Sequence, residues 1–448
     1  MKNKNIAYAA LAVLMLTGAC KKNNASGEGE NASSGSLINE STGWKKVGTI
    51  PFIHAVYAFA GSNAITPYDL TVVDNQLALL YSEDYKMTGV QGTLTYKVKF
   101  TPGSAIPASI PLKRGGWAFF YSTRFIPGTF TPVYMKMEGS NYTVSIYTDD
   151  ALIAGNNTDY TTPAIRPINW YGDGGLTMSV PGGNKQAYVL SYTFPNTGNF
   201  SVTENVWRLD PTNWKAFDAL RLSGGEINQF LVSTEGAKVY FSILKNNPDF
   251  ISRTGMEQSF FTLTRQEIPG LNAANFTSAN MIIASTVVND KYTVLIGETA
   301  PGGAGLGFNK VHCYQWQKGT TQFTKLYGDI ALPADIGSSF MSRAAIGTRP
   351  VEGADAAVKF TPDYSAYMLY NSIQSSKYTA LAIVNAQGAK TVGKYATADY
   401  PNQQYEQIGL ATCQYYNGAY YAVVYQKRED LFSINDPRFR LEIVKLNP

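Results

Sequence analysis

The stretch from residue 169 to 175, Asn-Trp-Tyr-Gly-Asp-Gly-Gly, combines residue types that are able to recognise a sugar. Trp170 and Tyr171 offer flat apolar rings, and Asp173 offers hydrogen-bond acceptors. Sugar binding uses this combination, because ring faces stack on apolar sugar faces while polar edges form hydrogen bonds. A structural interpretation competes with this one and is favoured over it: Trp170 packs between strands, and Asp173-Gly174 is a turn.

Carboxylates are the second group of side chains that are able to take part in catalysis. Cleavage of a glycosidic bond needs an acid and a base or nucleophile roughly 5 to 10 Å apart. Asp173, Glu226 and Glu406 are the nearest candidates for such a pair. A fold of this size carries some carboxylates near any cleft, so no catalytic residue is assigned. A polysaccharide hydrolase or lyase is kept as the alternative function.

Imidazole chemistry rests on two residues, His54 and His312, because the sequence has no other histidine. A Ser/His/Asp triad would have to use one of them. On a strand, His312 and its neighbour Cys313 point to opposite faces, so they make a poor catalytic couple. The sequence has no G-x-S-x-G, H-E-x-x-H or Walker motif and no Cys/His spacing typical of a metal site. We expect structural roles for both histidines, and neither a metal nor a cofactor.

The elements that would position these residues are strands. One pattern recurs seven times: β-branched and aromatic runs flank a short turn rich in Asn, Asp and Gly, which is the sequence form of a β-hairpin. The turns lie near Asn75, Ser140, Asn184, Gly236, Asp290, Asp363 and Asn417. The arms that follow the turns are apolar at most positions, which predicts strands buried on both faces.

An all-β chain with a repeat of roughly 50 residues resembles a β-propeller. The resemblance covers residues 44–448 and implies about seven four-stranded blades, with six or eight as alternatives and tandem β-sandwiches as the alternative architecture. We expect the segment Trp44 to Ile50 to pair with the last blade, so that the two chain ends close one sheet and remove exposed edges. One short helix is predicted from Asp210 to Leu220, where Asp210 is suited to cap it and Pro211 suits its first turn.

In a propeller, ligands usually meet the connections that lead into the innermost strands, around the central channel. The resemblance therefore places a set of weak ligand-binding candidates near that mouth: Arg114, Trp117, Trp170, Tyr171, Asp173, Glu226, Arg343, Tyr405 and Glu406.

The first nineteen residues predict an export signal. Lys2 and Lys4 precede an apolar run from Ile6 to Leu16, which is too short to span a bilayer. The run ends in Leu-Thr-Gly-Ala-Cys, residues 16–20, which resembles the lipobox of bacterial lipoproteins, with Leu16 one position earlier than usual. That resemblance implies cleavage after residue 19 and acylation, including palmitate, at Cys20.

Residues 20–43 predict a flexible tether between the acylated cysteine and the β domain, because they are rich in Ser, Gly, Asn and Glu. A lipobox, a polar tether and a Tyr-rich β domain together resemble outer-membrane lipoproteins of Bacteroidota. This implies a protein anchored to the cell outer membrane through Cys20, on its periplasmic or its surface face. The formal net charge of +4 is small and the basic residues are scattered, so we expect no nucleic-acid partner.

Cys313 and Cys413, the remaining cysteines, permit two interpretations: one disulfide, or two buried free thiols in apolar strands. For function, the sequence favours a non-catalytic binding or scaffold propeller that contacts a glycan or an outer-membrane protein. The alternatives are the polysaccharide hydrolase or lyase and a structural protein of envelope assembly.

Overall fold

A computed structural model describes most of the β domain. The chain divides into two units, residues 1–35 and 36–448, and every described residue belongs to the second. The described residues are 42–50, 65–87, 90–112, 120–125, 130–138, 143–147, 152–157, 166–170, 175–182, 186–193, 205–209, 214–251, 258–276, 281–300, 307–344, 358–371, 378–396, 406–428 and 441–448. Cys20, His54 and the predicted tether as far as residue 41 lie outside them.

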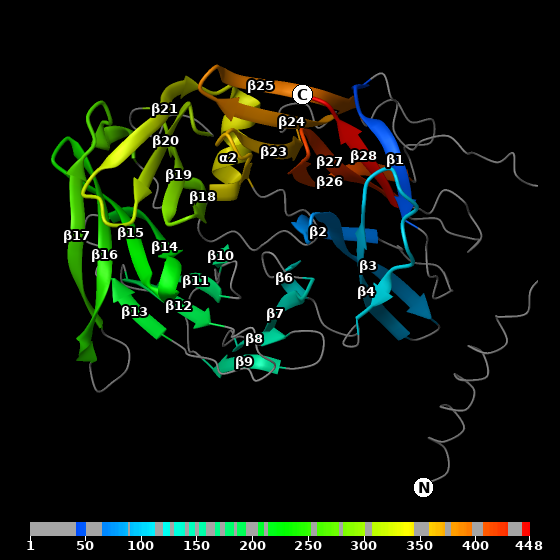
Figure 1. The fold of residues 1–448 in the computed structure, drawn as a ribbon, viewed down its shortest axis with the longest axis horizontal. Helices are drawn as coiled ribbons and strands as arrows, with labels where there is room; N and C mark the ends of the chain where they lie inside the picture. The colour runs from blue at the N-terminus through cyan, green and yellow to red at the C-terminus, as the bar shows by residue number, and fades with distance from the viewer. Residues whose placement is uncertain are drawn as a thin grey trace, which may run out of the picture. The chain divides into compact units, whose positions relative to one another are not determined.

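The described strands form seven antiparallel sheets of four strands each (Figure 1). The first sheet contains β2 (Ile65–Val73), β3 (Gln76–Met87), β4 (Val90–Phe100) and β5 (Ile110–Pro111). The second contains β6 (Phe120–Phe125), β7 (Pro132–Glu138), β8 (Thr143–Tyr147) and β9 (Leu152–Asn157). The third contains β10 (Arg166–Trp170), β11 (Gly175–Gly182), β12 (Gln186–Thr193) and β13 (Asn205–Leu209).

Four more sheets follow in chain order. The fourth contains β14 (Trp214–Arg221), β15 (Ile227–Glu235), β16 (Lys238–Ile251) and β17 (Gln258–Glu267). The fifth contains β18 (Ile282–Val288), β19 (Lys291–Glu298), β20 (Lys310–Gln317) and β21 (Phe323–Ala331). The sixth contains β22 (Lys359–Phe360), β23 (Ala366–Asn371), β24 (Tyr378–Asn385) and β25 (Gly388–Ala396). The seventh contains β26 (Glu406–Tyr416), β27 (Ala419–Arg428), β28 (Leu441–Leu446) and β1 (Lys45–Ile50).

Neighbouring sheets contact one another through their innermost strands. The strand β2 contacts both β26 and β6, and the contacts of β10 with β14, β14 with β18, and β18 with β22 continue this arrangement. Four-stranded antiparallel sheets that follow one another with their first strands innermost are the blades of a β-propeller. The predicted fold class and the preferred blade count of seven are therefore confirmed, and tandem β-sandwiches are excluded.

The seventh sheet joins the beginning of the β domain to its end. The strand β1 pairs antiparallel with β28, with Lys45 opposite Lys445 and Ile50 opposite Leu441, as expected from the sequence. Just before β1, the side chain of Trp44 is completely buried, and its Nε1–H donates a hydrogen bond of 2.8 Å to the carbonyl oxygen of Gly393 on β25. The indole therefore holds the beginning of β1 against the sixth sheet.

The recurrent hairpins do not all join the same pair of strands. The turns near Asn75, Asp290, Asp363 and Asn417 join the first and second strands of their sheets, whereas those near Ser140, Asn184 and Gly236 fall between second and third strands. This difference explains why the repeat spacing is uneven. The second strands β19 and β27 are buried on both faces along residues 292–298 and 420–424, as predicted.

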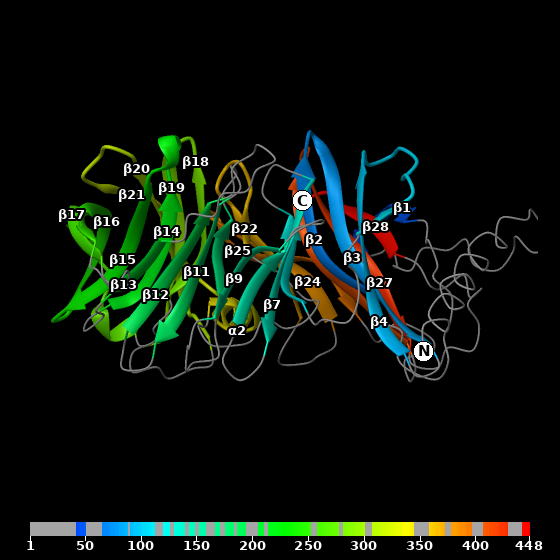
Figure 2. The ribbon, with the colours of Figure 1, turned by 90° about the horizontal axis from the view of Figure 1, so that it is seen from below.

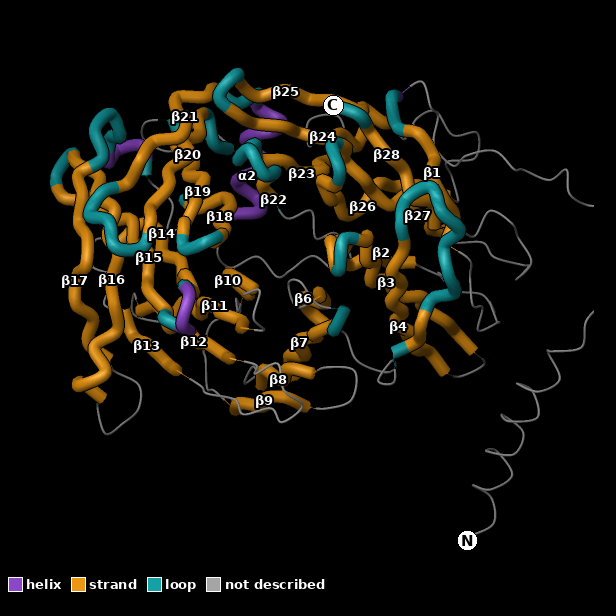
Figure 3. Tube along the Cα trace, viewed as in Figure 1, coloured by secondary structure: helices purple, strands orange, loops and turns teal. Residues whose placement is uncertain are grey.

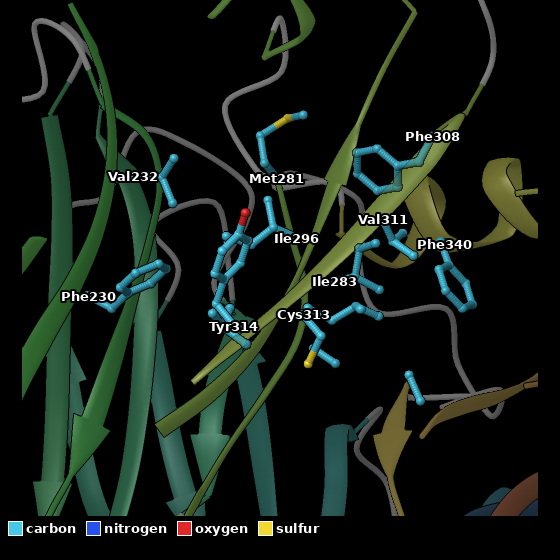
Figure 4. Packing of buried hydrophobic residues seen from close by; sticks show 14 of the residues in the cluster. Phe230, Val232, Met281, Ile283, Ile296, Phe308, Val311, Cys313, Tyr314 and Phe340 are labelled. Atoms are coloured by element: carbon cyan, nitrogen blue, oxygen red, sulfur yellow. The ribbon is translucent and has the colours of Figure 1, made fainter. Parts of the chain in front are cut away.

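Aromatic side chains fill the space between the fourth and fifth sheets. Phe230 of β15 lies 5.1 Å from Tyr292 of β19 between ring centroids, and Phe241 of β16 lies 5.0 Å from Tyr314 of β20 in an edge-to-face arrangement. Figure 4 shows Phe230, Tyr314, Cys313 and their neighbours in this core. Such aromatic pairs contribute about 0.5 to 1.5 kcal/mol beyond the burial of their surface.

The helix prediction was wrong for its described part, because residues 214–221 form the innermost strand β14. Strand β14 pairs with β15 from Ala216 to Arg221, so pairing within the sheet overrides the local capping signal. The structure instead contains α2 (Ala334–Ala344), which contacts β18 and β23 (Figure 3) and buries Ile336 and Phe340. Among the described residues, no helix is both long and apolar enough to cross a membrane.

Candidate functional site

The candidate residues divide between two opposite ends of the sheets. We call the end at which the innermost strands begin the start end, and the end at which they turn into the second strands the turn end; the strands run between these ends in Figure 2. Arg343 belongs to α2, which follows the end of β21 at the start end, and Glu406 is the first residue of β26, so both belong to the start end. Tyr405 precedes β26, and Arg114 and Trp117 precede β6; these three lie outside the described residues.

Trp170 and Glu226 belong instead to the turn end. Trp170 is the last residue of β10, and Glu226 lies between β14 and β15. Tyr171 and Asp173 fall between β10 and β11, outside the described residues. The sequence placed all nine candidates near one mouth of the channel, but the strand order separates the described ones, Arg343 and Glu406 at one end and Trp170 and Glu226 at the other. An innermost strand such as β14, with eight residues, is about 26 Å long at about 3.3 Å per residue, so one small ligand does not reach both groups.

Glu226 is held by cations of its own sheet and of the next one. Lys318 on the turn after β20 places its Nζ 3.0 Å from Glu226 Oε2, and Lys245 on β16 places its Nζ 4.0 Å from Oε1. Lys318 also donates a hydrogen bond of 3.1 Å to the carbonyl oxygen of Ser223, whose N–H donates to Asp290 Oδ1 at 2.6 Å. These contacts connect the turn ends of the fourth and fifth sheets.

The electrostatics of this cluster favour an ionised Glu226. Burial raises the pKa of the carboxyl group, but the hydrogen bond with Lys318 and the charges of Lys318 and Lys245 lower it by more, so the net pKa lies below the usual value. A general acid in glycoside cleavage needs a raised pKa. Glu226 is therefore suited to holding two sheets together or to binding a cation, and not to donating a proton at neutral pH.

A second polar cluster, which the sequence did not reveal, joins four innermost strands. Lys359 of β22 donates hydrogen bonds to the carbonyl oxygen of Leu70 on β2 at 2.9 Å and to Gln414 Oε1 on β26 at 3.2 Å. Its Nζ also lies 3.8 Å from Asp69 Oδ1. Asp69 accepts a further hydrogen bond of 3.1 Å from the backbone N–H of Phe125 on β6. The cluster therefore connects the sixth, seventh, first and second sheets near their turn ends.

Thr412 adds backbone strain to this cluster. It has a φ of +44°, a conformation that β-branched residues rarely adopt, and it lies at a β-bulge between Ala411 and Cys413. Its Oγ1 accepts a hydrogen bond of 3.0 Å from the backbone N–H of Leu70. The bulge thus aims a side-chain acceptor at the neighbouring sheet, and the Thr412 bond compensates part of the cost of the conformation.

His312 is buried in the fifth sheet. Its Nδ1 accepts a hydrogen bond of 3.2 Å from the backbone N–H of Asp329, and its Nε2 lies 3.4 Å from Glu298 Oε1. Because Nδ1 accepts a hydrogen bond, a neutral His312 carries its proton on Nε2, facing the carboxyl group of Glu298. With 1% of its side chain exposed, His312 is out of reach of a ligand, which agrees with the structural role expected for it.

Cys313 and Cys413 are buried free thiols, so the second of the two interpretations is confirmed. Burial raises the pKa of each thiol to about 12. Thiols with such a pKa are poor nucleophiles at neutral pH. Within the described parts of the chain, no three His, Cys, Asp or Glu side chains are arranged to hold a metal ion.

Comparisons with known proteins found similar structures but no similar sequence. No protein-family model matches the chain, and no curated protein matches its sequence. Among solved structures, it is similar to prolyl oligopeptidase B from Galerina marginata, with 9% identity over 81% of this chain and 47% of that chain and a TM-score of 0.36. It is also similar to TolB from Acinetobacter baumannii, with 10% identity over 75% of this chain and 81% of that chain and a TM-score of 0.32.

A third similar structure is Trypanosoma rangeli sialidase, with 10% identity over 90% of this chain and 57% of that chain and a TM-score of 0.33. The chain therefore spans less than two thirds of the length of either the oligopeptidase or the sialidase. A propeller fold is shared by proteins with unrelated activities, so the function has to be argued from the residues of this chain.

Proposed function

We propose that the protein is a lipid-anchored propeller of the outer membrane that binds a glycan or an envelope protein without catalysing a reaction. The anchor is the acyl group on Cys20, and residues 21–43 are the tether. Ligand contact is assigned to the start end, to which Arg343 of α2 and Glu406, the first residue of β26, belong. Arg114 and Trp117, which precede β6 in the sequence, and Tyr405, which precedes β26, are assigned to the same contact.

The observation that carries the proposal is the separation of the carboxylates. Glycoside cleavage needs two carboxyl groups roughly 5 to 10 Å apart, one of them with a raised pKa. Glu226 belongs to the turn end and has a lowered pKa, whereas Glu406 begins an innermost strand at the start end. Glu226 and Glu406 therefore do not form a catalytic pair, which favours binding over polysaccharide cleavage by a hydrolase or lyase mechanism.

The test combines binding and turnover measurements on the mature protein. A panel of envelope glycans and outer-membrane proteins is screened for binding by surface plasmon resonance, and each bound glycan is then incubated with the protein and analysed for cleavage products. We expect binding without products. Release of products that stops in a Glu406→Gln variant would establish the hydrolase or lyase instead.

Matched variants locate the binding surface. Arg343→Ala and Glu406→Gln are expected to weaken binding, whereas Glu267→Gln, an exposed carboxylate at the same end but on the outermost strand β17, is expected to leave it unchanged. If all three variants bind equally well, the start end near the channel is not the binding surface.

A further inference from the structure

The direction of β1 fixes where the anchor joins the propeller. The strand β28 runs parallel to β26, because both pair antiparallel with β27, and it ends at the turn end of the seventh sheet. Because β1 pairs antiparallel with β28, it begins at that same end, with Lys45 opposite Lys445. The chain therefore passes from the proposed tether into the propeller at the turn end, on the outermost strand.

The junction at this point is tight. Trp44 is completely buried, packs with Leu446 and other residues of its cluster, and donates its indole hydrogen bond to Gly393. The proposed tether, residues 21–43, is therefore followed directly by a fixed point on the outer edge of the seventh sheet. Its length as a flexible coil, roughly 25 Å, keeps this edge close to the membrane that holds Cys20.

Three lysines lie on strands at the junction. Lys45 and Lys445 lie directly opposite each other on adjacent strands, so their side chains share one face of the sheet. Like charges placed in this way destabilise a sheet unless an opposite charge approaches. Lys390, which is exposed on β25, lies three residues from Gly393. None of these three lysines makes an ion pair with another described residue. We call Lys45, Lys390 and Lys445 the anchor rim.

We infer that the anchor rim lies on anionic lipid headgroups, so that the turn end of the seventh sheet faces the membrane and the start end faces away from it. The inference rests on the proposed lipid anchor at Cys20. Each lysine near an anionic bilayer strengthens attachment roughly fivefold, and three lysines together bias the orientation strongly. The start-end candidates Arg343 and Glu406 then face away from the membrane, where a large glycan or protein has access to them.

Two labelling sites on one sheet test the orientation. Val288 ends β18 at the turn end and is 50% exposed, and Ala331 ends β21 at the start end and is exposed. Val288→Cys and Ala331→Cys are each labelled with a donor dye in the full acylated protein. The protein is reconstituted in vesicles of phosphatidylcholine with 30% phosphatidylglycerol and an acceptor dye at the bilayer surface. The buried thiols of Cys313 and Cys413 do not take up the label.

Energy transfer to the bilayer is expected to be higher from position 288 than from position 331. The difference is expected to fall in pure phosphatidylcholine and in 1 M salt, where the screening length is about 3 Å. It is also expected to fall when Lys45, Lys390 and Lys445 are all replaced by Gln. The control variant replaces Lys238, Arg265 and Lys310, which belong to the start end, by Gln; it has the same net charge and should retain the difference.

Equal transfer from the two positions, higher transfer from position 331, or a difference that survives loss of the anchor rim would overturn the inference. Thermal melting of each variant checks that it is folded. Failure of the anchor proposal gives a distinct result, because an unacylated protein does not float with the vesicles in a density gradient. Flotation without any difference between the labels rejects only the orientation.

Discussion

Replacement of Trp44 by Ala tests whether the closure of the seventh sheet stabilises the whole propeller. The indole is completely buried and connects β1 with β25. A buried aromatic side chain removes about 150 to 250 Å² from water, which at about 25 cal/mol per Å² corresponds to roughly 4 to 6 kcal/mol. Measured Trp-to-Ala costs are about 3 to 5 kcal/mol, so we expect the free energy of unfolding to fall by about 4 kcal/mol.

The assay is a urea titration followed by circular dichroism, combined with limited trypsin digestion. Trp44→Ala should shift the unfolding midpoint to lower urea and should allow cleavage after Lys45 and Lys46, which the paired strand protects in the native protein. The control, Trp44→Phe, keeps most of the apolar surface and removes the hydrogen bond to Gly393, so its cost should be about 1 to 3 kcal/mol. An unchanged midpoint and unchanged protease resistance in Trp44→Ala would refute the reasoning.

Three further predictions concern single residues. Because the pKa of Glu226 is lowered in the folded state, its contribution to stability is present above the unfolded pKa and disappears as the pH falls through the folded pKa; melting temperatures measured from pH 7 to pH 3 should therefore fall less for Glu226→Gln than for the parent. Cys313 and Cys413 should react with a thiol reagent at pH 8 only after denaturation, and rapid reaction of the native protein would contradict the burial that raises their pKa to about 12. Gly393→Ala should lower the melting temperature more than Gly418→Ala, because both glycines have positive φ but only at position 393 would the new methyl carbon clash with the buried indole nitrogen of Trp44; equal melting temperatures would count against this packing.

The fold was predictable because its signals are local. Apolar runs around Asn/Asp/Gly turns specify hairpins within a dozen residues, and the number of such hairpins indicated seven blades. The closing strand was also recognisable, since residues 44–50 lie ahead of the first hairpin and have no other partner in the repeat. It was harder to predict at which end of its sheet each hairpin turn lies. The sequence pattern of a hairpin is the same whether it joins the first and second strands or the second and third strands.

The helices show where local signals mislead. Residues 210–220 have a capping residue and a proline at suitable positions, yet residues 214–221 pair in a sheet. The helix α2, residues 334–344, contains Gly337, Ser338 and Ser339, which are poor helix formers. Ile336 and Phe340, four residues apart, are its sequence signal, and both are buried against the propeller.

The polar cluster of Lys359, Asp69 and Gln414 was not predictable from one sequence. Its members come from three sheets, and Lys359 lies 289 residues from its acceptor Leu70. A single charged residue in an apolar strand gives no sign of its partner. Such contacts exist only once the first and sixth sheets both lie beside the seventh.

The pairing of β1 with β28 has a consequence for biosynthesis. The first strand of the domain leaves the ribosome about 400 residues before its partner, and it has no sheet to join until the last residues have been made. A copy that lacks its C-terminal residues keeps an unpaired β27 edge, which is a template for aggregation and a target for proteases. The architecture therefore makes maturation depend on full-length synthesis, and quality-control proteases are able to distinguish incomplete copies by their open edge.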